Sequence, residues 1–148
     1  MFIVHPSFIF GPWADTYPRP ITKETLGVNG LLYSIITGSV LPIFPCFVDV
    51  RDVAKAHLLA MDLPPSPGVL NRRYITNCRE ISWKEAVEHM QKTHSELKMP
   101  PPSQYSDSLL RVDTSDTIRD LKFGKFREPE QVLDDAVVAL QEVEKTWA

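Results

Sequence analysis

The sequence predicts an α/β fold, in which short strands of a parallel sheet are followed by helices. Residues 1–4 form a short continuous apolar run, which is typical of a strand buried on both faces. Two further apolar residues, Phe47 and Val48, lead into a helix at 53–63 that is apolar almost all round. Residues 129–147 carry an apolar stripe at helical spacing. Strands and helices therefore alternate along the chain.

Composition indicates one ordinary globular domain over residues 1–148. Hydrophobic residues make up 43% of the chain and charged residues 24%, which allows a real core. The formal net charge of −3 gives no electrostatic reason to expect nucleic acid or an anionic membrane as a partner. No apolar run approaches the ~20 residues that cross a bilayer, and the N-terminus lacks the charged region of a signal peptide.

Cysteine and histidine spacing gives no sign of a metal site. Cys46 and Cys78 match neither a metal motif nor a disulfide framework, so we expect two reduced thiols in a cytoplasmic protein. His89 and His94 each lack a second ligand at the helical spacing that a metal site would use. His94 falls on an apolar helix face and is expected to be a partly buried structural histidine.

The first strand should end early. Pro6 fixes its backbone and has no N–H, so it is expected to end the strand, and residues 7–12 should carry the chain out of the sheet. A strand buried on both faces needs neighbours, and the chain supplies none upstream of it. This is the first indication that part of the sheet is missing.

A loop and a helix are predicted next. Pro18 and Pro20 favour a loop over residues 13–28. Asn29 is then expected to cap a helix that stops at Gly38.

The stretch from Phe47 to Met61 is the centre of the chain. Asp49 can cap the helix that follows it, and Asp52 adds negative charge where the helix dipole favours it. Arg51, next to these two carboxylates, is expected to join a fixed ion pair at the strand–helix junction. The helix at 53–63 has few polar residues and is expected to be the most buried helix of the fold.

The remaining elements follow from local signals. The proline-rich segment 64–68 forbids a helix and indicates an exposed turn, and residues 73–76 read as a short strand. Ser82–Glu85 has the pattern of a capping box, which starts a helix. A short helix is expected at 115–121, and Pro129 is expected to open the last helix.

Three segments resemble one family. "FVDVRDVAKAHLLAM", "HPSFIFGP" and "VDTSDTIRDLKFGKF" closely resemble the extended short-chain dehydrogenases/reductases, of the NAD-dependent epimerase/dehydratase type. Within them the chain looks most like the fungal NADPH-dependent ketone and aldehyde (methylglyoxal-type) reductases related to dihydroflavonol and cinnamoyl-CoA reductases. The resemblance covers nearly all 148 residues but only the later half of the family's chain. It implies the last strands of a Rossmann-like parallel sheet plus a mostly helical substrate-binding region.

The same resemblance implies site residues. Pro6 and Ser7 would contact the carboxamide end of NADP, and Asn29 would lie near its phosphates. From the residues alone, Pro6 could equally be a strand terminator and Asn29 a helix cap.

A substrate pocket is implied as well. Phe8, Trp13 and Tyr17 would line it, and the expected substrate is a small carbonyl compound. An aromatic side chain in a loop can also serve packing alone.

Two parts of the family's machinery do not occur in these 148 residues. No glycine-rich phosphate turn follows a strand. No tyrosine is followed four residues later by the lysine that would acidify its phenol, because those positions hold Ile21, Thr37, Cys78 and Leu109. We therefore assign no catalytic residue and expect the N-terminal nucleotide-binding half to be absent.

Two functions follow from these observations. The chain is either the substrate-binding, C-terminal portion of an NADP-dependent reductase, inactive in isolation, or a non-catalytic module derived from the same fold. A module of that kind would bind a partner through the exposed sheet edge, since an open parallel edge is prone to pairing.

Overall fold

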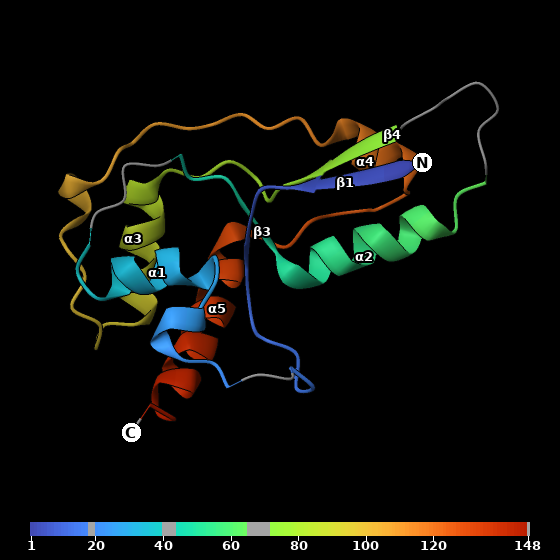
Figure 1. Cartoon of the computed structure of the whole chain (residues 1–148). Coiled ribbons are helices and arrows are strands. Elements are labelled where there is room, and N and C mark those ends of the chain that lie inside the picture. Colours follow the sequence, from blue (N-terminus) through green and yellow to red (C-terminus); the bar gives the residue numbers. More distant parts are fainter. Residues whose placement is uncertain (18–19, 40–43, 65–71, 148) are drawn as a thin grey trace.

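The computed structural model describes residues 1–17, 20–39, 44–64 and 72–147 (Figure 1). The segment 64–68, where a turn is predicted, lies almost entirely outside the described residues. In chain order the elements are β1 (Phe2–Pro6), β2 (Phe8–Phe10), a 3-10 turn (Lys23–Thr25), α1 (Asn29–Ile36), β3 (Phe47–Asp49), α2 (Val50–Met61), β4 (Arg72–Thr76), α3 (Trp83–Thr93), a second 3-10 turn (Pro102–Gln104), α4 (Ser115–Asp120) and α5 (Pro129–Glu144).

The described strands form two small parallel sheets. β1 pairs with β4, and β2 pairs with β3. The prediction that residues 7–12 leave the sheet is wrong for residues 8–10, because these three β-favouring residues find a partner in β3. Ser7 alone separates β1 from β2, so the chain passes directly from one sheet into the other.

Strand β1 is half-buried, so the prediction of a strand buried on both faces is wrong. Of the described helices, α2 packs against β1, on the face that carries Phe2 and Val4. Ile3 is half-buried, and His5 on the same face as Ile3 is exposed. The apolar run indicates a strand correctly, but burial of a second face requires a layer that the described residues do not supply.

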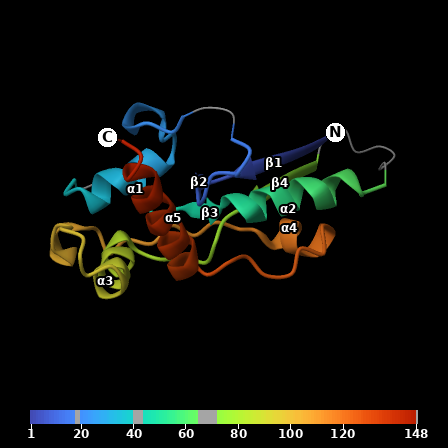
Figure 2. The ribbon, with the colours of Figure 1, turned by 90° about the horizontal axis from the view of Figure 1, so that it is seen from below.

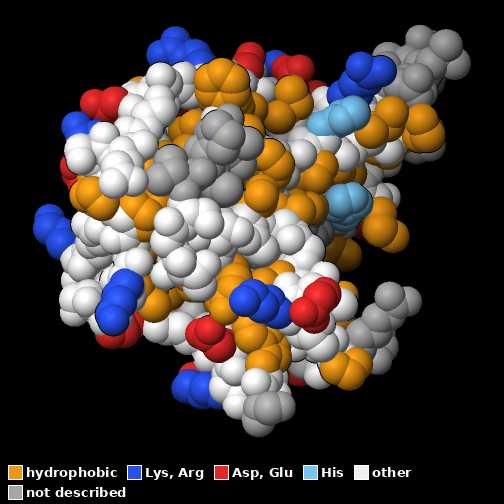
Figure 3. Space-filling model, turned by 60° about the vertical axis from the view of Figure 1, so that its left-hand side comes forward, with side chains coloured by type: hydrophobic (Ala, Val, Ile, Leu, Met, Phe, Trp, Pro, Cys, Tyr) orange, Lys and Arg blue, Asp and Glu red, His pale blue; other side chains and the backbone are white. Residues whose placement is uncertain are grey.

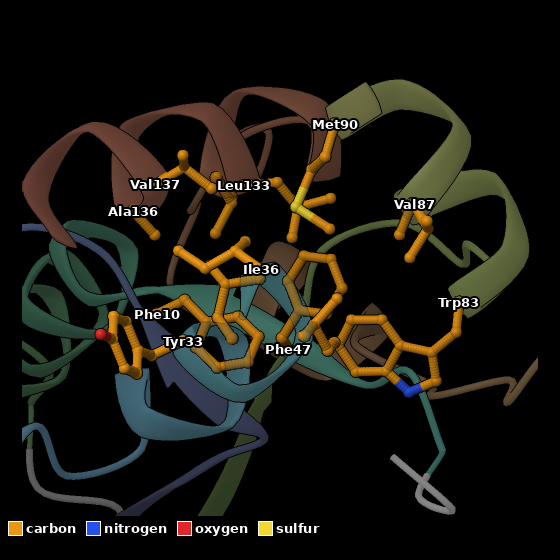
Figure 4. Close-up of a cluster of buried hydrophobic side chains, with 14 of the residues drawn as sticks. Phe10, Tyr33, Ile36, Phe47, Trp83, Val87, Met90, Leu133, Ala136 and Val137 are labelled. Carbon is orange, nitrogen blue, oxygen red and sulfur yellow. The ribbon is translucent and has the colours of Figure 1, made fainter. Parts of the chain in front are cut away.

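Two clusters of buried side chains form the core, one beside each sheet. The larger, which we call the β2–β3 core, lies between β2, β3, α1, α3 and α5 (Figure 4). Phe47 is its centre, with ring centroids 5.3 Å from Phe10 and 6.0 Å from Trp83. The smaller lies between α2 and the β1–β4 sheet, where Tyr74 stacks on Phe2 at 6.4 Å.

Helix α2 is buried along one side only, which corrects the prediction for 53–63. Ala56 and Ala60 pack inward, whereas Leu58 is 65% exposed and Met61 79% exposed. The two-stranded sheet covers only one side of α2, so apolar residues on the other side remain exposed to solvent. By contrast, α5 buries a continuous apolar stripe against α1, α3 and the β2–β3 sheet.

The predicted starts of α3 and α5 are confirmed, whereas the predicted start of α1 is not. The capping box is confirmed, since the Glu85 N–H donates to Ser82 Oγ at 3.1 Å and the Ser82 N–H donates to Glu85 Oε2 at 2.9 Å. Pro129 is the first residue of α5, as predicted. The capping alternative for Asn29 is wrong, because Asn29 lies inside α1 and its side chain binds the backbone of Gly11 instead.

Ion pairs hold the junction between β3 and α2. Asp49 is fully buried and accepts a hydrogen bond from the Arg51 N–H at 2.7 Å. Its carboxylate also forms an ion pair with the Arg51 guanidinium at 2.6 Å. Arg51 also binds Asp135 on α5. Asp52 accepts the Arg127 N–H at 2.8 Å and binds its guanidinium. These contacts tie the start of α2 to α5 and to the segment before it.

Gly11 follows β2 at a point where the backbone comes very close to this junction. Its φ is +135°, and a Cβ placed on it would lie 2.9 Å from Val50 Cγ1. Asn29 holds the same residue from the other side, accepting the Gly11 N–H at 3.2 Å and donating to its carbonyl at 2.9 Å. Only glycine satisfies both the backbone angle and the close approach.

We expect Gly11→Ala to lower the free energy of unfolding by about 1–3 kcal/mol, because it adds overpacking to backbone strain. Urea unfolding followed by circular dichroism measures the effect. Gly27→Ala is the matched control, since Gly27 also has a positive φ, +60°, but no atom lies within 4 Å of the added Cβ. Equal losses in the two variants would contradict the close-approach argument.

Replacing Arg51 with Met should cost about 1–3 kcal/mol of stability, because the buried Asp49 carboxylate loses its ionic partner. Asp135→Asn should cost less than about 1 kcal/mol, since the Asp135 side chain is partly exposed. Thermal unfolding of the two variants beside the parent chain measures both effects. An unchanged melting midpoint for Arg51→Met would rule out a stabilising role for this pair.

Candidate functional site

The carboxyl ends of β1 and β4 lie side by side and carry polar side chains. The Ser7 hydroxyl donates to Asn77 Oδ1 at 2.6 Å, and Thr76 O lies 3.1 Å from it. The Ser7 N–H also donates to Thr76 O, at 3.1 Å. In parallel α/β sheets, ligands bind outside this end of the strands. The group around Ser7 is therefore the candidate site.

Pro6 and Phe8 flank Ser7 and differ in exposure. Pro6 is the exposed last residue of β1, with no N–H to be satisfied. Phe8 is half-buried at the start of β2, where its N–H donates to Cys46 O at 3.2 Å and its ring packs against the β2–β3 core. The two strands thus fix the backbone on both sides of Ser7.

Asn29 lies at the other end of β2. Its side chain is buried and binds the N–H and the carbonyl of Gly11, three residues beyond Phe8. A strand of this length spans roughly 10 Å. The residues predicted to hold the cofactor therefore lie at opposite ends of β2, with Pro6 and Ser7 before the strand and the Asn29 side chain after it, at Gly11. The side-chain amide of Asn29 has one hydrogen that is not used in its bonds to Gly11.

The predicted pocket aromatics also differ from one another. Trp13 is half-buried and packs against the β2–β3 core, as Phe8 does. Tyr17 is 45% exposed, in a turn closed by a hydrogen bond from its N–H to Ala14 O at 2.9 Å. The structure thus places Phe8 and Trp13 on one core and leaves Tyr17 at the surface.

A cavity of about 230 Å³ opens beside Asn77, at the carboxyl end of β4. Its charged side chains are already paired, with Arg79 bound to Glu128 at 3.1 Å. Burial raises the pKa of the Cys78 thiol to about 12, so this thiol is not an activated nucleophile. The predicted substrate residues are not among its lining, which consists of Asn77, Cys78, Arg79, Val112, Thr114, Ile118, Gly124, Lys125, Phe126, Arg127 and Glu128.

Two buried tyrosines, Tyr33 and Tyr105, do not have the electrostatics of a proton donor. Burial raises the pKa of Tyr33, and its hydrogen bond to Glu144 at 2.8 Å raises it further. Burial also raises the pKa of Tyr105, whose hydroxyl donates to Ser39 O at 3.0 Å. A reductase needs the opposite, a phenol made more acidic by a nearby cation.

Two histidines at α3 bind a carboxylate of α5, and these contacts have a structural role. His89 and His94 both place Nε2 at 3.0 Å from the carboxylate of Asp134, and His94 is buried as predicted. Within the described residues, no group of three or more His, Cys, Asp or Glu side chains is arranged to hold a metal ion. In the same part of the chain, no helix is long and apolar enough to cross a membrane.

Sequence reasoning missed three partners of the predicted residues. Asn77, which accepts the Ser7 hydroxyl, could have been found because it directly follows a predicted parallel strand. Asp135 and Arg127, which bind Arg51 and Asp52, lie more than seventy positions away and leave no local signal.

Comparison with known proteins gives a consistent answer. No protein-family model matches the chain. It is 30% identical over 152 residues to ketoreductase azaE of Aspergillus niger, covering 94% of the chain and 43% of the relative. It is 26% identical over 147 residues to tetraketide alpha-pyrone reductase 2 of Arabidopsis thaliana, covering 95% of the chain and 42% of that protein.

The fold agrees with these relatives. The structure of yeast methylglyoxal/isovaleraldehyde reductase Gre2 complexed with NADPH matches with a TM-score of 0.72 and 24% identity, over 96% of this chain and 43% of that one. The chain thus spans less than half the length of the relatives it matches, and the matched part is their C-terminal portion. The chain is therefore similar in sequence and fold to the C-terminal part of extended short-chain dehydrogenases/reductases, and the relatives that it matches are reductases.

Proposed function

We propose that residues 1–148 form one unit, the substrate-binding C-terminal portion of an NADP-dependent oxidoreductase that reduces small ketones or aldehydes by hydride transfer. The observation that carries this proposal is the near-complete match of the chain to one portion of the reductases, 94–95% of the chain against 42–43% of the relatives. A nucleotide-binding half must then supply the glycine-rich turn and the acidified tyrosine.

The chain's own residues fit the nicotinamide end of such a cofactor. Pro6 is exposed at the carboxyl end of β1, and its ring makes that backbone rigid. Ser7 is held by Asn77, so its position is fixed before a ligand arrives. NADPH bound there would supply the hydride, while Pro6 and Ser7 orient the carboxamide. Asn29 holds the Gly11 turn and has one N–H left for the cofactor.

The substrate side is assigned to the segment after β2. Phe8 and Trp13, both packed against the β2–β3 core, give an apolar wall with little freedom to move. Tyr17 is exposed and can close over a small carbonyl compound from the solvent side. The free thiols of Cys46 and Cys78 fit a reducing compartment, so we place the protein in the cytoplasm.

A second candidate function is a non-catalytic module that binds a partner through β1. Among the described residues, no strand pairs with the outer edge of β1, and this favours the second function because an unpaired strand edge is a template for pairing. The lack of lysine four residues after any tyrosine agrees with both functions.

Fusing the N-terminal portion of yeast Gre2 before Phe2 should give a chimera that oxidises NADPH in the presence of small diketones or aldehydes. The 148-residue chain alone should show only background, because loss of general acid help costs ~10²–10⁴ in rate and loss of orientation costs more. Absorbance of the reduced cofactor follows the reaction. Sustained protein-dependent turnover by the isolated chain would overturn the proposal, and a folded chimera that binds NADPH without turnover would favour the module.

In that chimera, Trp13→Ala should lower kcat/KM for a bulky carbonyl substrate by roughly 10-fold or more, because removing an apolar pocket wall weakens binding. Most of the change should appear in KM. Leu109→Ala is the control, since Leu109 is exposed and has no assigned role at the site. Equal kinetics in the two variants would remove Trp13 from the pocket.

A further inference from the structure

The segment that carries two of the proposed pocket residues is held to the fold at two points. Just before it, the Gly11 backbone forms hydrogen bonds of 3.2 and 2.9 Å with a side chain of α1. Further along the chain, the carbonyl of Ile21 accepts a hydrogen bond from the indole N–H of Trp147 at 2.7 Å. Trp13 and Tyr17 lie between these two points in the sequence. The bond from Trp147 therefore fixes the second end of this stretch.

The side chain of Trp147, which comes shortly after α5, is itself held in place. It packs edge-to-face with Tyr33 of α1, with ring centroids 5.5 Å apart and an angle of 74° between the planes. The Tyr33 hydroxyl donates to Glu144 Oε1, at the end of α5, at 2.8 Å. Figure 2 shows this end of α5 beside α1. The indole N–H thus has a fixed position from which to hold Ile21.

The turn that follows Ile21 is ordered by bonds within itself. The Thr22 N–H donates to Thr25 Oγ1 at 2.8 Å, and the Thr25 N–H donates to Thr22 O at 3.0 Å. Leu26 comes next and is buried in the β2–β3 core. Because the bonds of the turn are local, they do not tie it to α5. The bond from Trp147 to Ile21 makes that connection and limits how far the preceding stretch can move.

A fixed wall matters for a pocket that binds by apolar contact. Hydrophobic side chains gather over much of the face seen in Figure 3, so apolar surface is plentiful on this molecule. One methylene more or less changes kcat/KM in an apolar pocket by about 10–200-fold. A wall that can retreat loses this discrimination, because it makes room for the larger group. Selection by size therefore depends on what holds the wall.

We propose that Trp147 is a positioning residue, whose bond to Ile21 holds Trp13 and Tyr17 in place and so limits the size of the carbonyl substrate. The inference rests on the proposed function, because it takes these two aromatic residues as part of the substrate pocket. Trp147 acts through the stretch that it holds and not by contact with the substrate. Losing its N–H should weaken binding of small carbonyl compounds and favour larger ones.

Trp147→Phe in the Gre2 chimera tests this role, because phenylalanine keeps a ring against Tyr33 and removes the N–H. With a small aldehyde, KM should rise about 2- to 10-fold, as expected for the loss of one hydrogen bond, while kcat stays within about twofold. The ratio of kcat/KM for a bulky ketone to kcat/KM for the small aldehyde should rise by a similar factor, because the apolar wall remains and can retreat. The Kd for NADPH should not change.

Tyr105→Phe is the matched control. It also removes one side-chain hydrogen bond to a backbone carbonyl, that of Ser39 at 3.0 Å, from a residue of the same β2–β3 core. KM and the selectivity ratio should stay as in the parent chimera. Amide hydrogen exchange gives a second readout: peptides that contain Trp13 and Ile21 should exchange faster in Trp147→Phe but not in Tyr105→Phe.

Circular dichroism checks that the variants are folded, and Trp147→Leu, which also lacks the donor, replaces Trp147→Phe if the latter does not fold. Faster exchange with unchanged KM and selectivity would overturn the positioning role. Unchanged exchange would do the same, as would equal changes in Trp147→Phe and Tyr105→Phe. All of these outcomes leave the parent chimera active. A parent chimera that binds NADPH without turnover would instead refute the proposed function, and this inference with it.

Discussion

The close approach of Gly11 to the start of α2 is the constraint on which the rest of the structure depends. A Cβ at this position would lie 2.9 Å from Val50 Cγ1, so a side chain at residue 11 would have to displace Val50 at the point where β2 and β3 end. Asn29 holds Gly11 from the α1 side, and the Asp49–Arg51–Asp135 ion pairs hold the same point to α5. One crossing point therefore joins β2, β3, α1, α2 and α5.

That crossing point positions the candidate site. Only Ser7 lies between the end of β1 and the start of β2, so fixing β2 also fixes Ser7 at the carboxyl end of the β1–β4 sheet. Asn77 Oδ1 then accepts a hydrogen bond from the Ser7 hydroxyl at 2.6 Å, which joins the ends of β1 and β4. The outcome is a rigid corner with an exposed Pro6 beside it, which suits a surface that completes a cofactor site rather than one that builds it alone.

Elements with local signals could be predicted from the sequence, and elements that depend on distant partners could not. The Ser82–Glu85 capping box and Pro129 follow from short-range chemistry and occur as predicted. The burial of α2 was predicted wrongly, because its apolar residues do not reveal whether a second layer covers Leu58 and Met61. Within the site, family resemblance leads to Ser7, whereas Asn77 becomes visible only once β1 and β4 are known to be neighbours.

We propose that Pro6, Ser7 and Asn29 complete a nicotinamide site whose other part is a nucleotide-binding half. Amide NMR shifts of an isotope-labelled Gre2 chimera, recorded with and without NADPH, test it most directly. We expect saturable shifts centred on Ser7 and Phe8 in the chimera, and no saturable shifts in the isolated chain. Shifts centred elsewhere, such as at Cys78 and Arg79 beside the 230 Å³ cavity, or saturable NADPH binding by the isolated chain, would contradict it.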